Sequence, residues 1–128
     1  MDKTVLVVDD DPADMKRMVN VLSREGYKVL EASNAEETLL KVHQALPGLV
    51  IIDVVLAGSE TTGFDVCRKI KTTFQPKPPR VLLVTGKSAA VNVSLANQMG
   101  ADGFEAKTSD MAQVVKAAKH LFLSANGG

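Results

Sequence analysis

Hydrophobic residues along the chain fall into short continuous runs that alternate with longer amphipathic segments. Thr4–Val8 and Leu49–Ile52 are apolar throughout, which is typical of strands that are covered on both faces. Between such runs, apolar residues recur every three or four positions, as in a helix with one buried face. The pattern predicts strands over Thr4–Val8, Tyr27–Ala32, Leu49–Ile52, Arg80–Val84 and Asp102–Ala106.

Helix start and stop signals follow the first two predicted strands. Asp11 is expected to cap the first helix, with Pro12 at its first position and Gly26 at its end. Asn34, with Glu37 three residues later, resembles a capping box for the second helix. The side chains expected to face inward are Met15, Met18, Val19 and Leu22; Ala35, Leu39, Val42 and Leu46; Phe64, Cys67, Ile70 and Phe74; and Met111, Val114, Val115, Ala118 and Phe122.

The remaining segments complete the outline. Ala57–Gly63 is expected to be a polar loop, and Gln75–Pro79, with its three prolines, a turn. A weakly amphipathic fourth helix is expected over Ser88–Met99. The last helix is expected to begin at Ser109 or Asp110, and Ser124–Gly128 to form a flexible tail or the start of a linker, so that the domain comprises residues 1–123.

Five strand–helix units predict an α/β fold, a (βα)5 three-layer sandwich of the flavodoxin-like type. The order 2-1-3-4-5 of its parallel five-stranded sheet is inferred from the fold type and not from individual residues. In that order the first and third strands are neighbours, at the point where ligands bind in such sheets.

Composition narrows the class of protein. A chain of 128 residues with 45% hydrophobic and 23% charged residues is an ordinary single globular domain. Fifteen basic and fifteen acidic side chains cancel, so the sequence predicts no nucleic acid and no membrane surface as partner. The single Cys67 excludes an internal disulfide, and no apolar stretch is long enough to be a secretory signal or to span a bilayer. We therefore expect a cytoplasmic protein.

Four of the predicted strands end in polar residues, namely Asp9-Asp10, Asp53, Thr85 and Lys107. These residues should converge, because the carboxyl ends of parallel strands lie along one edge of the sheet. Two carboxylates about 4 Å apart repel by roughly 4 kcal/mol at an effective dielectric near 20, so such a cluster takes up a proton or binds a cation. Mg²⁺ prefers oxygen ligands of this kind. Asp53 would then be an ionised nucleophile for a phosphoryl group, with Lys107 and Thr85 as donors to its oxygens.

The order of these motifs resembles that of a response-regulator receiver domain of two-component signalling. The matching segments cover essentially the whole chain: Val-Val-Asp-Asp-Asp-Pro, Ile-Ile-Asp, Val-Thr-Gly and Gly-Ala-Asp-Gly-Phe-Glu-Ala-Lys. The resemblance implies Mg²⁺-dependent phosphorylation of Asp53, with Asp10 as a direct metal ligand and Asp9 bound mainly through water. It further implies that the carbonyl of Val55 is a metal ligand.

The resemblance also implies partners. The phosphoryl donor would be a sensor histidine kinase or a phosphotransfer protein. A downstream protein, whose identity the sequence leaves open, would bind the face formed by the fourth helix, fifth strand and fifth helix. Phe104 matches the aromatic switch position of the family, and an ordinary core aromatic is the alternative.

Two departures from the family pattern affect the predicted site. Thr108 follows Lys107 where the family usually has proline, often in a cis peptide. A cis bond before a non-proline residue costs about 3–4 kcal/mol, so the Lys107–Thr108 bond is either trans, with a moved loop, or retains that strain. The loop after Asp53 is longer than the common form of the family, and Ala57 replaces a frequent proline.

Other functions compete with the phosphorylation switch. These departures leave open a pseudo-receiver, a binding module of the same fold that works without phosphorylation. A phosphoryl-transfer enzyme of the haloacid-dehalogenase type would need a second acid where this chain has Val55. A flavodoxin-like flavin site is disfavoured because the acids after the first strand would repel the phosphate of the cofactor. We therefore expect a non-enzymatic signalling domain.

Overall fold

The computed structural model describes residues 3–55, 62–86 and 93–127. Its parallel strands have the order β2-β1-β3-β4-β5, so the predicted flavodoxin-like topology is confirmed. The strands are β1 (Thr4–Val8), β2 (Lys28–Ala32), β3 (Leu49–Asp53), β4 (Arg80–Thr85) and β5 (Gly103–Ala106). The helices are α1 (Pro12–Arg24), α2 (Ala35–Ala45), α3 (Gly63–Thr73), α4 (Val93–Gln98) and α5 (Ala112–Gly127).

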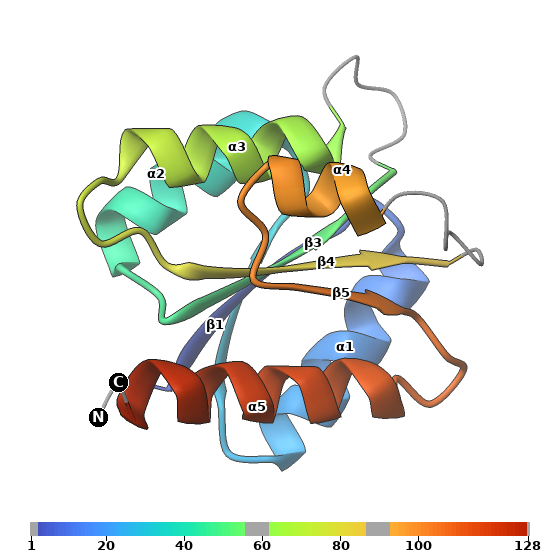
Figure 1. Ribbon diagram of the computed structural model, residues 1–128. Helices are drawn as coiled ribbons and strands as arrows, with labels where there is room; N and C mark the ends of the chain where they lie inside the picture. Colours follow the sequence, from blue (N-terminus) through green and yellow to red (C-terminus); the bar gives the residue numbers. More distant parts are fainter. Residues whose placement is uncertain (1–2, 56–61, 87–92, 128) are drawn as a thin grey trace.

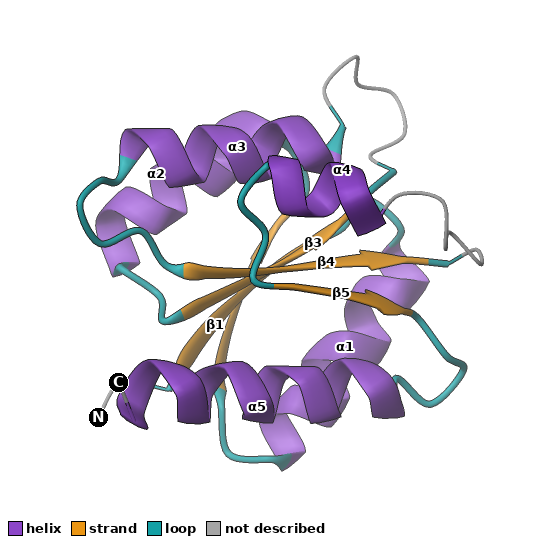
Figure 2. Cartoon of the chain, viewed as in Figure 1, coloured by secondary structure: helices purple, strands orange, loops and turns teal. Residues whose placement is uncertain are grey.

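Helices cover both faces of the sheet, so that the fold has three layers with the sheet in the middle (Figures 1 and 2). Helices α1 and α5 pack on one face, and α2, α3 and α4 on the other. The side chains of β1 and β3 alternate between the two resulting cores, which is why both strands are apolar throughout and fully buried. Strand β3 is the central strand of the sheet, as in the expected order 2-1-3-4-5, and its last residue, Asp53, lies where β3 pairs with β4.

Helix caps explain where the first two helices begin. The carboxylate of Asp11 accepts a hydrogen bond from the N–H of Ala13 at 3.0 Å, so the predicted cap of α1 is confirmed. Asn34 caps α2 by accepting the N–H of Glu37 at 2.8 Å. The carboxylate of Glu37, however, accepts the N–H of Ser33 at 3.1 Å, one residue earlier than a capping box requires.

The prediction that Leu46 faces inward is wrong. This residue ends α2 in the left-handed conformation, with φ 48°, and its side chain is 72% exposed. The helical period therefore stops one residue too early to bring Leu46 onto the buried face. Val42, one turn earlier, is fully buried as predicted.

The later helices agree with the sequence over part of their length. Phe64, Cys67 and Ile70 of α3 are buried as predicted. The expected loop over residues 57–61 and the first part of the expected fourth helix, residues 88–92, lie outside the described residues. The last helix begins at Ala112, later than the expected start at Ser109 or Asp110, and the carboxylate of Asp110 accepts the N–H of Ala112 at 3.0 Å. Helix α5 then continues to Gly127, so the backbone of the expected tail is helical up to that residue.

Candidate functional site

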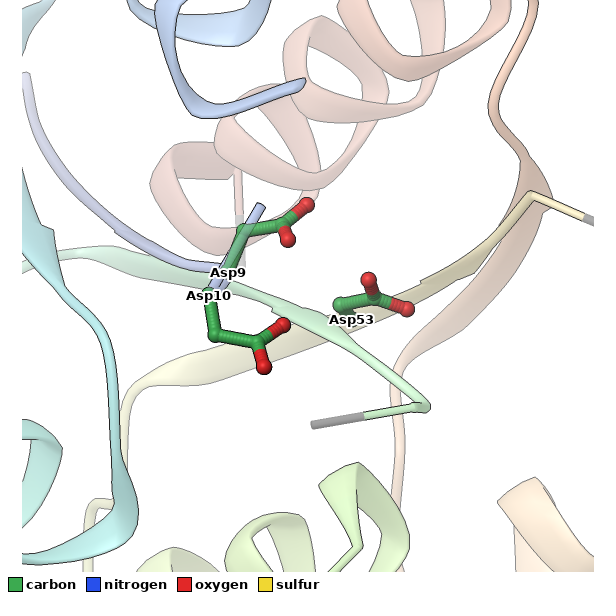
Figure 3. A group of neighbouring side chains, drawn as sticks. All are labelled: Asp9, Asp10 and Asp53. Carbon is green, nitrogen blue, oxygen red and sulfur yellow. The ribbon is translucent and has the colours of Figure 1, made fainter. Parts of the chain in front are cut away.

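Three carboxyl groups meet at the carboxyl edge of the sheet. Asp9 and Asp10 follow β1, Asp53 ends β3, and each contributes an oxygen to a cluster whose members lie within 4.8 Å of one another (Figure 3). Asp9 is 2% exposed and Asp53 7% exposed, whereas Asp10 is half-buried. The convergence of these acids therefore agrees with the expectation from the strand ends.

Backbone N–H groups hold two of these carboxylates in place. The N–H of Asp11 donates to Oδ1 of Asp9 at 2.9 Å, and the N–H of Val55 donates to Oδ1 of Asp53 at 3.1 Å. Val54 continues the sheet, because its N–H donates to the carbonyl of Val84 at 2.8 Å. Each carboxylate thus has one oxygen bound to the backbone and the other directed to the interior of the site.

The ammonium of Lys107 lies among the acids. Its Nζ is 3.0 Å from Oδ2 of Asp53, 3.1 Å from Oδ2 of Asp9 and 2.8 Å from Oδ2 of Asp14. The side chain of Lys107 is only 7% exposed. An ammonium donates three hydrogen bonds, so these acceptors use all of its donors.

The backbone around Lys107 explains how its side chain reaches the site without the usual proline. Lys107 donates its N–H to the carbonyl of Thr85 at 2.8 Å and thereby extends the pairing of β4 with β5. Within the described residues the only cis peptide is Gln75–Pro76, so Lys107–Thr108 is trans. Of the two alternatives left open by the sequence, the trans bond is correct.

Thr85 and Val55 lie beside this cluster. Thr85 ends β4, is 5% exposed and pairs with Ala106, next to Lys107. The side chain of Val55 is 64% exposed, and its N–H is the donor to Asp53. The roles given to the Thr85 hydroxyl and the Val55 carbonyl stay predictions.

Sequence reasoning missed Asp14. It lies in the first turn of α1, and its carboxylate forms the shortest of the contacts to Lys107. A signal for it existed: a helix that begins directly after the Asp9-Asp10 pair places its first turn at the same edge of the sheet.

Burial and pairing shift the pKa values of the site in different directions. Burial, reinforced by the charge of Asp53, raises the pKa of Asp9 from 3.8 to about 6. The hydrogen bond from Lys107 lowers the pKa of Asp14. Burial acts against the charge of Lys107, but its hydrogen bonds to Asp14 and Asp53 outweigh burial, so the pKa of Lys107 is raised.

The donor set fits a hard divalent cation such as Mg²⁺. Its ligand atoms are carboxylate oxygens, and Asp10, which makes none of the Lys107 contacts, lies at the solvent side of the cluster. The ammonium of Lys107 neutralises part of the charge of Asp9 and Asp53, so a cation bound at this edge would have to share these two carboxylates with the lysine.

Phe104 of β5 packs against the core on the α3 side of the sheet. Its ring stacks on that of Phe64, with ring centroids 6.4 Å apart and planes 15° from parallel. Phe104 is partly buried, so this packing agrees with the alternative that Phe104 is an ordinary core aromatic. Its role as a switch stays a prediction.

Comparison with known proteins agrees with the fold and the motifs. Residues 5–119 match the family described as response regulator receiver domain. The chain is 33% identical over 107 residues to the alkaline phosphatase synthesis transcriptional regulatory protein PhoP of Bacillus subtilis, covering 84% of this chain and 43% of that protein. It spans 43% to 50% of the length of the transcriptional regulators that it matches in this way.

Solved structures show the same architecture. The CheY-like response regulator receiver domain protein of Methanospirillum hungatei superposes with a TM-score of 0.84 at 26% identity, and the match covers 100% of both chains. The response regulator TrrA of Thermotoga maritima, solved in complex with Mg²⁺-BeF, gives a TM-score of 0.80 at 28% identity and covers 93% of this chain and 98% of that one.

Proposed function

The chain belongs to the response regulator receiver domain family of two-component signalling, and we propose that it is phosphorylated on Asp53 in the presence of Mg²⁺. The observation that carries this proposal is the position of the Lys107 ammonium, 3.0 Å from the Asp53 carboxylate and 3.1 Å from that of Asp9, at the edge where the three acids meet. A carboxylate that is ionised and flanked by cations needs no separate base to attack phosphorus.

The metal is assigned to the acidic cluster. Asp10, Asp53 and the carbonyl of Val55 would bind Mg²⁺ directly, and Asp9 mainly through water. The bound metal would lower the repulsion between Asp53 and an incoming phosphoryl group. Lys107 and Thr85 would donate to the phosphoryl oxygens. The Mg²⁺-BeF complex of TrrA supports this assignment by similarity.

The donor and the target follow from the family. The phosphoryl donor is a sensor histidine kinase or a phosphotransfer protein. A downstream protein would bind the face of α4, β5 and α5, where a groove lies between β5 and α5 and includes Phe104, Lys116 and His120. Since acidic and basic side chains cancel, we propose that this domain contacts proteins and not nucleic acid.

The family consists of regulatory signalling domains, and we propose that this chain is likewise not an enzyme. None of the helices in the described ranges is long and apolar enough to cross a membrane. A cytoplasmic location remains our prediction from the sequence.

A pseudo-receiver is the second candidate, favoured by Thr108 in place of proline. Mg²⁺-dependent uptake of beryllofluoride distinguishes the two functions, because a binding module that works without phosphorylation has no reason to bind a phosphoryl mimic. We expect a saturable change in the amide NMR spectrum, centred on Asp53, Thr85 and Lys107. A spectrum that does not respond to beryllofluoride with Mg²⁺ would favour the pseudo-receiver.

Incubation with acetyl phosphate tests the phosphorylation itself. We expect intact mass measurement to show one added phosphoryl group with Mg²⁺ and none when the metal is chelated, because the ion is needed to offset the negative charges of donor and acceptor. Modification that proceeds equally well with a chelator would contradict the proposed role of the metal.

The raised pKa of Asp9 predicts that Mg²⁺ affinity depends on pH. Mg²⁺ binds the ionised carboxylates, so below about pH 6 it must displace a proton from Asp9. We expect binding measured by titration calorimetry to be about tenfold weaker at pH 5 than at pH 7. Equal affinity at the two pH values would contradict the prediction, and an Asp9→Asn variant should show a much smaller difference.

The same shift affects the metal-free protein. The pKa of Asp9 in the folded protein lies above 3.8, the ordinary value that an aspartate has in an unfolded chain. Protonation of Asp9 therefore favours the folded state. This contribution is fully present below about pH 4 and is lost as the pH rises through about 6. The melting temperature, measured with a chelator present, should therefore rise as the pH falls through this window in the parent. It should rise less in the Asp9→Asn variant.

A further inference from the structure

Asp14 contacts Lys107 from helix α1, whereas the other acids of the site lie at the ends of strands. Its Oδ2 lies 2.8 Å from Nζ of Lys107, whereas the ammonium is 3.0 Å from Asp53 and 3.1 Å from Asp9. Asp9 follows β1 and Asp53 is the last residue of β3, but Asp14 belongs to α1. The lysine is therefore shared between the sheet edge and a helix.

The second oxygen of Asp14 is bound as well. Oδ1 accepts a hydrogen bond from the guanidinium of Arg17 at 2.8 Å, one turn further along α1. The side chain of Arg17 is 52% exposed and that of Asp14 is 19% exposed. Asp14 thus bridges a cation at the surface and a buried one, and the lowered pKa of Asp14 means that it carries its charge at neutral pH.

The contacts of Lys107 determine how strongly its ammonium pairs with the carboxylate of Asp53. Because the three N–H donors of the ammonium are all used, the strength of its contact with Asp53 depends on the competing acceptors. If one acceptor is lost, the ammonium must pair more closely with those that remain. A divalent cation that needs Asp53 and Asp9 then competes with a stronger ion pair.

We propose that Asp14 is a positioning residue, which draws the Lys107 ammonium toward α1 and so leaves the charge of Asp53 and Asp9 available to a divalent cation. The inference rests on the function proposed above and assigns a part in it to a residue outside the predicted acceptor and metal set. Asp14 would act only through Lys107, without touching the metal or the phosphoryl group.

A double-mutant cycle isolates an effect that passes through the lysine. Mg²⁺ affinity is measured by titration calorimetry at pH 7 for the parent, Asp14→Asn, Lys107→Gln and the double variant. We expect Asp14→Asn to weaken binding about fivefold when Lys107 is present and less than about twofold in the Lys107→Gln background. Equal factors in the two backgrounds would show that Asp14 acts by its charge alone and would overturn the proposal.

Asp11→Asn is the matched control. It removes the same charge from the same end of α1, and asparagine also caps helices well. Asp11 makes none of the contacts to Lys107, and its side-chain contact with Asp14 is one that an asparagine amide can keep. We expect its Mg²⁺ affinity to stay within about twofold of the parent. A loss as large as that of Asp14→Asn would also overturn the proposal.

The experiment separates this inference from the function on which it rests. A parent protein that binds no Mg²⁺ would reject the proposed function, and the role of Asp14 with it. A parent that binds Mg²⁺, combined with equal factors in the two lysine backgrounds, would reject the role of Asp14 alone. Urea unfolding of each variant verifies that the affinities refer to folded protein.

Discussion

Replacing Asp53 with asparagine is expected to abolish phosphorylation by acetyl phosphate. The amide has nearly the shape of the carboxylate and keeps an oxygen that can accept the N–H of Val55, but it lacks the negative charge that makes the side chain a nucleophile. We expect the phosphorylated fraction to fall from most of the protein to background. Intact mass after incubation with acetyl phosphate and Mg²⁺ measures the outcome.

Asp110→Asn is a suitable control for this variant. The exposed carboxylate of Asp110 accepts the N–H of Ala112 at the start of α5, and asparagine keeps an oxygen that can accept the same hydrogen bond. The control should therefore be phosphorylated to the same extent as the parent. An added phosphoryl group on the Asp53→Asn protein would show that another residue is the acceptor, and would refute the central assignment.

The fold was predictable because local and long-range signals agree. The apolar runs of β1 and β3 identify strands that are buried on both faces, and Asp11 and Asn34 mark helix starts that the structure confirms. Leu46 shows the limit of this reasoning. A helical period cannot tell whether its last apolar residue lies within the helix or beyond its end, where the backbone turns into the left-handed region.

The site was predictable to the extent that strand ends determine it. Asp9, Asp10, Asp53 and Lys107 meet because parallel strands share one edge. Two features depend on geometry that the strand pattern does not contain. The reach of Lys107 depends on a trans peptide and on the pairing of its N–H with Thr85, and the contact of Asp14 depends on the direction in which α1 leaves the sheet.

Gly63→Ala is expected to have the largest effect on stability. A Cβ atom on Gly63 would lie 2.2 Å from the carbonyl oxygen of Asp53 and 2.8 Å from the Cα of Val54. Both are backbone atoms, so neither can turn aside, and α3 would have to move away from the end of β3. We expect the free energy of unfolding in urea to fall by about 3 kcal/mol or more.

The expected loss comes from the lack of space and not from backbone conformation. Gly26 and Gly100 have positive φ, but Gly63 does not, so alanine can adopt the backbone angles of Gly63. Gly86→Ala is the matched control, because its Cβ would meet only the Cε of Lys107, at an ordinary 3.7 Å, and its unfolding free energy should change by less than about 1 kcal/mol. If Gly63→Ala is as stable as this control, α3 does not lie against the end of β3. If it is destabilised as expected, α3 has moved away from the carbonyl of Asp53, the proposed acceptor, and phosphorylation should fall with stability.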